Sequence, residues 1–114
     1  MNTETYIEIE QRLALLSEIE KVDTLLSLFS ETYTKDYQKA THYASHALRI
    51  AKKINEPERL GNALIAKIKV ERKKGHYDNA VKFGNQAIKI LKPTPFYEQL
   101  VKVYNLLGLT YLKT

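Results

Sequence analysis

The sequence predicts an all-α fold made of antiparallel helix pairs, and three observations lead to this prediction. A block of residues recurs 40 positions further along, its members follow helical spacing, and prolines and glycines stand where helices would begin and end. No stretch alternates polar and apolar residues between turn signals as a half-buried strand would. We expect one domain with short connections, which make neighbouring helices antiparallel. The six expected helices span about 4–18, 20–33, 36–54, 57–74, 77–91 and 95–113.

The internal echo is the strongest of these features. Aromatic residues match aromatic ones, small match small and aliphatic match aliphatic. The first copy is Tyr37, Ala40, Tyr43, Ala44, Ala47, Leu48 and Ile50, and the second is Tyr77, Ala80, Phe83, Gly84, Ala87, Ile88 and Ile90. The positions follow the three-and-four rhythm of one helix face. The small residues would let a neighbouring helix approach closely, where larger side chains would overpack the core.

Prolines and glycines mark the expected helix ends. Pro57 suits the first turn of a helix, because its missing N–H would have no partner there. Gly75 can close that helix in a left-handed conformation. Pro93 stops the helix before it, and Thr94 followed by Pro95 predicts an N-cap and a first-turn proline.

The first expected helix would act as a cap. It is apolar at Tyr6, Ile9, Leu13 and Leu16. The end of a stack of helical repeats needs such a cover. We therefore expect this helix to close the N-terminal end of the array.

Composition bounds the function. The 114 residues are 44% apolar and 27% charged, as in soluble globular domains. The absence of cysteine excludes disulfides and thiolate metal sites. The acidic start does not resemble a secretory signal, and the apolar runs are too short to span a membrane. We expect a cytoplasmic protein with no cofactor, no metal and no membrane partner.

Charge is unevenly distributed along the chain. Residues 1–57 carry 7 basic and 9 acidic residues, whereas residues 58–114 carry 11 basic and 4 acidic ones. The halves therefore have net charges of −2 and +7. This asymmetry predicts an acidic partner for the second half, and a solvated basic surface is the alternative.

The repeated block resembles the tetratricopeptide-repeat (TPR) family, in which each repeat is a pair of helices, A then B. The aromatic and small positions of helix B match at Tyr37, Ala40, Tyr43 and Ala47, and again at Tyr77, Ala80, Phe83 and Ala87. The helix A pattern matches at Tyr104, Leu107, Gly108 and Tyr111. The resemblance covers about residues 20–114 and implies a right-handed superhelical array, a TPR-like α-solenoid. It divides the chain into a capping helix at 1–19, repeats at 20–56 and 57–93, and helix A of an incomplete third repeat at 94–114.

The match departs from the family in two ways. The middle helix A has Lys67, Ile68 and Glu71 where the family has Leu, a small residue and Tyr. The period of 40 is longer than the usual ~34 residues. This longer form is similar to the arrays at the front of bacterial histidine kinases, nucleotide cyclases and transcription regulators, and to TPR receptors that read quorum-sensing peptides. The middle helix is also the most basic, so we look there first for function.

A final helix A without a helix B would leave an apolar face open. Leu106, Leu109 and Leu112 would be exposed, each forgoing roughly 1.5–3 kcal/mol of burial. We therefore expect self-association through this helix, and we expect the chain to be the N-terminal part of a longer protein.

The resemblance implies that extended peptides or partner segments bind along a concave face lined by the A helices. The residues carried over to that face are Asn62, Ile65, Lys69, Arg72, Lys73, Lys102, Asn105, Leu109 and Lys113. Amide and ammonium donors on rigid helices can hold carboxylates. The expected function is a non-catalytic protein-binding or peptide-binding module, the sensor or scaffold part of a bacterial signalling or regulatory protein. A purely structural dimerisation module is one alternative.

A basic nucleic-acid-binding domain is another alternative. The run Lys67–Gly75 could contact phosphates, although no recognition helix or RNA-binding signature accompanies it. His42 and His46 stand four apart, as in the beginning of a zinc site, but the sequence offers no cysteine to complete it.

An enzyme is not expected. The four glycines stand alone and form no phosphate-binding loop, and no Ser/His/Asp grouping accompanies a nucleophile turn. Most of the eight tyrosines fall at repeat core positions, so we expect them in the core.

Overall fold

The computed structural model describes residues 8, 13, 14 and 16–113, and these form five α-helices. The helices are α2 (Glu18–Thr32), α3 (Tyr37–Ile54), α4 (Pro57–Lys74), α5 (Tyr77–Leu91) and α6 (Tyr97–Tyr111). The described residues contain no strand, so the all-α prediction is confirmed. The count is five helices and not six, because the expected capping helix at 4–18 lies almost wholly outside the described residues.

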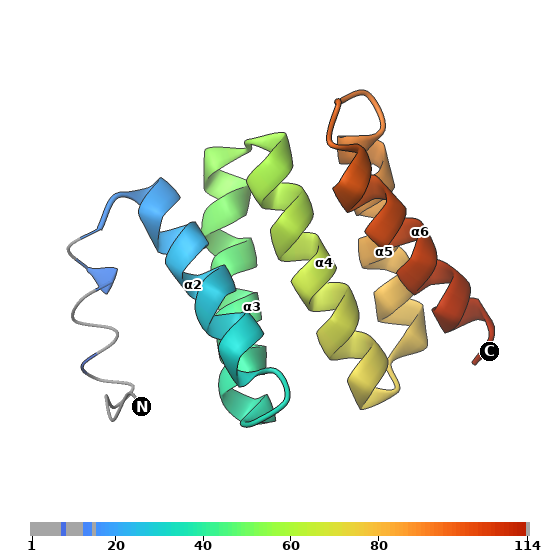
Figure 1. The fold of residues 1–114 in the computed structure, drawn as a ribbon, viewed down its shortest axis with the longest axis horizontal. Coiled ribbons are helices and arrows are strands. Elements are labelled where there is room, and N and C mark those ends of the chain that lie inside the picture. Colours follow the sequence, from blue (N-terminus) through green and yellow to red (C-terminus); the bar gives the residue numbers. More distant parts are fainter. Residues whose placement is uncertain (1–7, 9–12, 15, 114) are drawn as a thin grey trace.

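The five helices form two layers. Figure 1 shows α2, α4 and α6 nearer the viewer and α3 and α5 behind them. We call these the front layer and the back layer. Each helix packs against the next along the chain, and α4 also contacts both α2 and α6. None of the helices in the described part of the chain is long and apolar enough to cross a membrane.

Side-chain caps begin two of the helices. The Ser17 hydroxyl accepts from the Glu20 N–H at 3.2 Å, and the Glu20 carboxylate accepts from the Ser17 N–H at 3.0 Å. This reciprocal pair starts α2 at Glu18, two residues before the expected start. Asp36 starts α3 by accepting from the Lys39 N–H. Pro57 occupies the first turn of α4, as predicted.

The helix ends agree with the sequence in part. Gly75 closes α4 with φ of +81°, as predicted. Asn55 closes α3 in the same left-handed region, with φ of +56°. The prediction that Thr94 caps the last helix is wrong, because α6 begins at Tyr97. The Thr94 hydroxyl instead donates to the Leu91 carbonyl at 2.6 Å and accepts from the Phe96 N–H at 3.2 Å, so it shapes the loop between α5 and α6.

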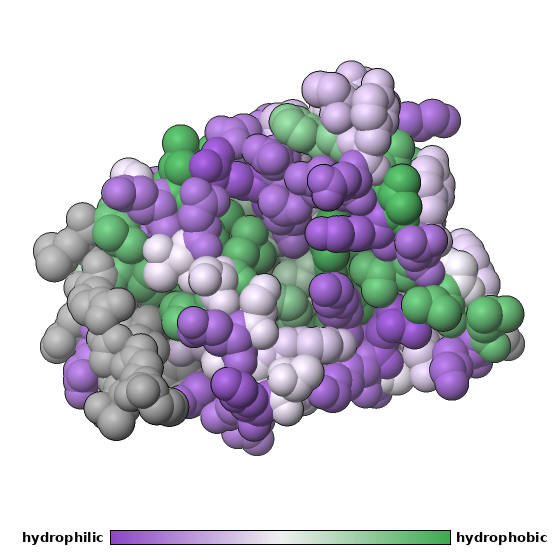
Figure 2. Space-filling model, in the orientation of Figure 1, coloured by the Kyte–Doolittle hydropathy of each residue, from purple (hydrophilic) through white to green (hydrophobic). Residues whose placement is uncertain are grey.

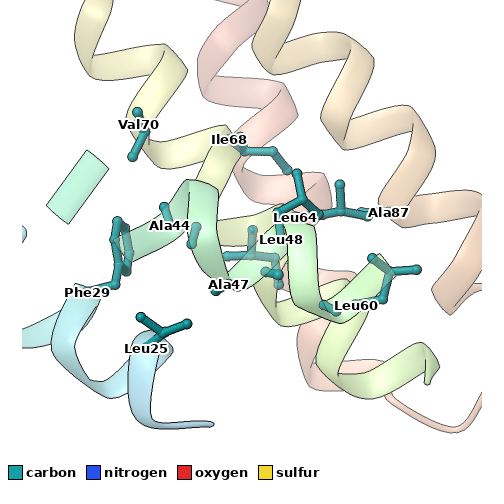
Figure 3. Packing of buried hydrophobic residues seen from close by; sticks show 14 of the residues in the cluster. Leu25, Phe29, Ala44, Ala47, Leu48, Leu60, Leu64, Ile68, Val70 and Ala87 are labelled. Carbon is teal, nitrogen blue, oxygen red and sulfur yellow. The ribbon is translucent and has the colours of Figure 1, made fainter. Parts of the chain in front are cut away.

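Small residues line the close contacts between helices, as predicted. The alanines of the echo are completely buried in α3 and α5. Figure 3 shows Ala44, Ala47 and Ala87 among larger apolar residues. A Cβ atom built on Gly84 of α5 would lie 2.4 Å from Cδ2 of Leu107 in α6. A Cβ atom on Gly61 of α4 would lie 2.7 Å from Cδ2 of Leu91 in α5. Both glycines are therefore places where a leucine of the neighbouring helix fills the space of a side chain.

The tyrosines differ from expectation. Tyr43 is buried, but Tyr37 is only half-buried and donates its hydroxyl to the Val70 carbonyl at 2.6 Å. The three tyrosines of α6, Tyr97, Tyr104 and Tyr111, are exposed, so the core prediction is wrong for the repeat positions Tyr104 and Tyr111. Among the described residues, α6 packs against α4 and α5, which leaves one side of the helix open.

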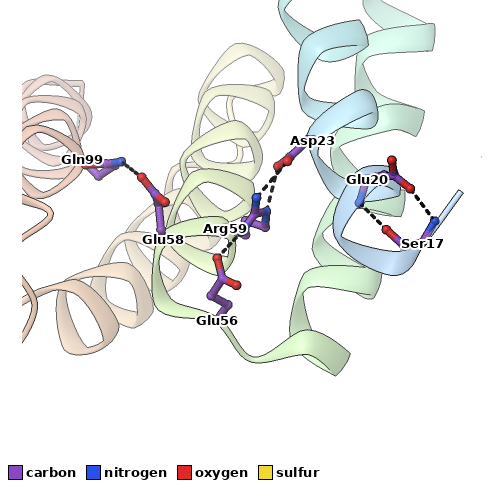
Figure 4. A network of polar contacts seen from close by, with 7 residues as sticks. All are labelled: Ser17, Glu20, Asp23, Glu56, Glu58, Arg59 and Gln99. Atoms are coloured by element: carbon purple, nitrogen blue, oxygen red, sulfur yellow. Dashed lines mark hydrogen bonds and ion pairs between the residues drawn. The ribbon is translucent and has the colours of Figure 1, made fainter.

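Polar contacts link the helices of the front layer (Figure 4). Arg59 of α4 donates two hydrogen bonds of 2.9 Å to Asp23 of α2 and also contacts Glu56. Gln99 of α6 donates to Glu58 of α4 at 3.5 Å. These contacts lie at the N-terminal ends of α4 and α6 and fix how the front layer is assembled.

Candidate functional site

The residues expected to bind a partner lie on two adjacent helices. Asn62, Ile65, Lys69 and Lys73 follow one face of α4, with Arg72 at its edge, and Lys102, Asn105, Leu109 and Lys113 follow one face of α6 and the residues just after it. The two helices contact each other within the front layer. We call these nine residues the front face. Figure 2, which shows the molecule from this side, has mostly hydrophilic side chains with hydrophobic groups between them.

Accessibility varies across the front face. Lys73 and all four residues of the α6 row are exposed, and Asn62, Lys69 and Arg72 are half-buried. Ile65 is buried, with 7% of its surface exposed, so it offers little area to a partner. The α6 row and the C-terminal half of the α4 row are therefore the accessible part.

The front face is positively charged. Five of its nine residues are basic and none is acidic. Within the described residues, the side-chain ammonium groups of Lys69, Lys102 and Lys113 make no hydrogen bond or ion pair, and the buried Nε of Arg72 has no hydrogen-bond partner. These nine residues therefore carry an excess of positive charge.

Lys73 is held in place by aromatic residues. Its Nζ lies 4.8 Å from the ring centroid of Tyr33 and 5.0 Å from that of Tyr37, and it donates to the Tyr33 carbonyl at 3.4 Å. Cation–π contacts of this kind orient an ammonium group without neutralising it. These contacts place the ammonium group of Lys73 at the C-terminal end of α4.

Arg59 stabilises the packing of the front layer, and its charge is already paired. Hydrogen bonding to Asp23 is the largest influence on its guanidinium and, with the contact to Glu56, raises its pKa despite partial burial. Two carboxylates thus compensate this cation. The cationic part of the face is left to the residues further along α4 and α6.

A second cationic feature, on the side of the back layer, was missed by the sequence reasoning. A shallow hollow of about 360 Å³ is lined by Ser45, Leu48, Arg49, Lys52, Lys67 and Phe83. Lys67 donates to the Ser45 hydroxyl at 3.1 Å and lies 5.7 Å from the Phe83 ring centroid. Burial lowers the pKa of Lys67. The signal in the sequence was that Lys67 occupies the position where Leu107 stands 40 residues later.

The basic run Lys67–Gly75 does not form one surface. Lys67 points into the back hollow, whereas Lys69 and Lys73 lie on the front face. Glu71 lies between Lys69 and Lys73 in the sequence. Its side chain is buried and accepts a hydrogen bond from the Asn79 amide at 3.0 Å. The run therefore lacks the continuous basic patch that the nucleic-acid alternative requires.

The Glu71 carboxylate is held by the start of α5. Besides Asn79, the ring Nδ1 of His76 lies 3.3 Å from it. Burial acts to raise the pKa of Glu71, but these hydrogen bonds and the nearby Lys67 and Lys74 outweigh it, so the pKa is lowered. Glu71 thereby joins α4 to α5 as an ionised group.

The two histidines of the expected pair lie close together on α3. The rings of His42 and His46 have centroids 6.0 Å apart. Among the residues that the structure describes, no three His, Cys, Asp or Glu side chains are grouped as a metal site requires.

Comparisons with known proteins add no relative. No protein-family model matches the chain, and neither a curated protein nor a solved structure matches it. The resemblance to the TPR family thus rests on the residues of the repeat.

Proposed function

We propose that this chain is a non-catalytic, TPR-like helical-repeat module that binds an acidic segment of a partner protein along the front face. The observation that carries the proposal is the pairing of two adjacent helix rows with five basic residues and no carboxylate. In this proposal α2, α4 and α6 are the A helices and α3 and α5 the B helices. Contacts of α4 with both α2 and α6 are what such an assignment requires.

The spacing of the rows suits an extended chain. Residues four apart on a helix, such as Lys69 and Lys73, lie about 6 Å apart along its axis. Alternate residues of an extended peptide project to one side about 6.6–6.8 Å apart. Successive lysines of one row can therefore pair with alternate acidic residues, and the amides of Asn62 and Asn105 can bond the peptide backbone.

The wider role follows the same resemblance. We place the module in a cytoplasmic signalling or regulatory protein of bacteria, where binding of the acidic segment is the recognition step. The charge of the face governs capture and specificity, because electrostatic complementarity speeds encounter and rejects partners of like charge.

Fluorescence anisotropy tests the proposal. The probe is a fluorescein-labelled peptide of alternating glutamate and serine, with a lysine and serine peptide as the reversed-charge control. We expect Lys69→Glu combined with Lys102→Glu to weaken binding of the acidic peptide at least tenfold. The matched control is Lys82→Glu combined with Lys89→Glu, which makes the same charge change at exposed sites on α5 and should leave binding within about twofold.

Two results would refute the front face as the binding site. Equal losses in the two double variants would mean that net charge alone attracts the peptide. Tighter binding of a 20-base-pair DNA duplex than of the peptide, with a steep dependence on salt, would favour the nucleic-acid alternative.

A further inference from the structure

Exposed apolar residues form a continuous stripe along α6. Tyr97 is 67% exposed, Val101 55%, Tyr104 48%, Tyr111 57% and Leu112 82%. With Gly108 they recur at intervals of three and four residues, which places them on one side of the helix. We call these six residues the α6 stripe. Leu109 is also exposed, but it belongs to the front face, and Leu106, which was expected to be open, is half-buried against the core.

The internal repeat shows what such a stripe normally contacts. The positions 40 residues earlier lie on α4, and those equivalent to the centre of the stripe are buried. Leu64 and Ile68, the counterparts of Tyr104 and Gly108, are completely buried. At Gly61, the counterpart of Val101, the side chain of Leu91 of α5 occupies the space beside the glycine. The described residues supply no helix in the equivalent place beside α6.

Gly108 marks the centre of the vacant contact. At the other two glycines inside helices, a leucine side chain of the neighbouring helix occupies the space beside the glycine. Leu91 packs against Gly61, and Leu107 packs against Gly84. A Cβ atom built on Gly108 would meet nothing within 4 Å. Gly108 therefore leaves a notch, flanked by the large side chains of Tyr104 and Tyr111, that a side chain of a docking helix can fill.

We propose that the α6 stripe binds the α6 stripe of a second copy of this chain, with the two helices antiparallel about a two-fold axis between Tyr104 and Asn105. In this register Val101 of each copy enters the notch at Gly108 of the partner subunit. Tyr97 then lies opposite Leu112 of the partner subunit. The stripe is thus self-complementary, as a two-fold interface requires.

The exposed area agrees with this occupant. The exposed fractions amount to about 550 Å² per copy, taking roughly 200 Å² for a tyrosine and somewhat less for valine or leucine. The total of about 1,100 Å² lies at the lower end of specific interfaces, so we expect a reversible dimer with a Kd on the order of 10–100 µM.

Analytical ultracentrifugation from 1 to 500 µM tests the dimer. We expect the wild-type chain to pass from monomer to dimer over this range. Val101→Glu should raise the Kd at least tenfold. Leu109→Glu is the matched control, since Leu109 lies on the same helix, is 49% exposed and is off the stripe; it should leave the Kd within about twofold, with both variants equally helical by circular dichroism. A wild-type chain that stays monomeric at 500 µM, or equal effects of the two substitutions, would overturn the proposal.

Disulfide cross-linking tests the register. The chain has no cysteine, so single substitutions report one pair at a time. Tyr104→Cys lies next to the two-fold axis and should form disulfide-linked dimers under mild oxidation. Tyr97→Cys should not, because the two copies of residue 97 would be about 22 Å apart along the helices. Cross-linking of both variants, as parallel helices would give, would exclude the antiparallel arrangement. Neither experiment involves the acidic peptide, so this proposal and the proposed function can fail separately.

Discussion

The close contact between Gly84 of α5 and Leu107 of α6 makes a prediction that can be worked out in detail. In Gly84→Ala, the new methyl group would lie 2.4 Å from Cδ2 of Leu107 and 2.8 Å from its Cγ. Leu107 is 5% exposed, and its Cγ lies near the backbone and moves little by rotation. Relief of the overlap therefore requires α5 and α6 to move apart slightly.

Two opposing terms set the magnitude. Overpacking of a filled core costs about 1–3 kcal/mol. Alanine is favoured over glycine inside a helix by about 0.8–1.0 kcal/mol. The overlap is severe, so the first term should prevail, and we expect Gly84→Ala to lower the free energy of unfolding by about 0.5–2 kcal/mol.

Gly108→Ala is the matched control, because nothing lies within 4 Å of the added methyl group. Only the helix-propensity term applies, so this variant should gain about 0.5–1 kcal/mol. Urea unfolding followed by circular dichroism at 222 nm measures both, at 2 µM so that self-association does not intervene. With an m-value of about 1–3 kcal/mol/M, the two midpoints should move in opposite directions by a few tenths of a molar or more. A Gly84→Ala variant as stable as the wild type would refute the close packing of α5 on α6.

Three further outcomes are expected from single substitutions. Tyr37→Phe should cost about 1 kcal/mol by leaving the Val70 carbonyl without its 2.6 Å hydrogen bond, whereas Tyr77→Phe, at the equivalent repeat position, should be nearly neutral in the same urea titration. Ser17→Ala should cost about 1 kcal/mol by removing the cap of α2; an unchanged midpoint would contradict the capping box. Because folding lowers the pKa of Glu71, its ionised carboxylate stabilises the fold at pH values above its ordinary pKa of 4.5. This stabilisation is lost as the pH falls through the folded-state pKa. Glu71→Gln should therefore flatten the fall in stability between pH 5 and 3, and an unchanged slope would show that Glu71 is not the group responsible.

The sequence predicted helices well where local signals were unambiguous. Pro57 and Gly75 bound α4 at both ends as expected, because each imposes a backbone conformation by itself. The prediction that Thr94 caps a helix was wrong because its hydroxyl can bond in two directions along the chain. In the structure it donates to the Leu91 carbonyl and accepts from the Phe96 N–H, and it caps no helix. The cap formed by Ser17 and Glu20 was visible in the sequence, but the prediction placed a helix across it.

The candidate site was predictable by position and not by environment. Helical spacing alone puts Lys69 and Lys73 on one face, and the structure places that face beside α6. Spacing could not show that Ile65 is buried, since this depends on how closely the helices approach. Nor could it show that Lys67 reaches across to Ser45 and Phe83, because those residues lie 22 and 16 positions away in the sequence and are brought near only by packing.

Chemical-shift mapping by NMR tests the central claim most directly. The isotope-labelled chain is titrated with the peptide of alternating glutamate and serine. The acidic-segment proposal requires the largest shift changes at the front face, at Lys69 and Lys73 of α4 and at Lys102 and Asn105 of α6. Changes centred instead on the back hollow, at Arg49, Lys52 and Lys67, would contradict it.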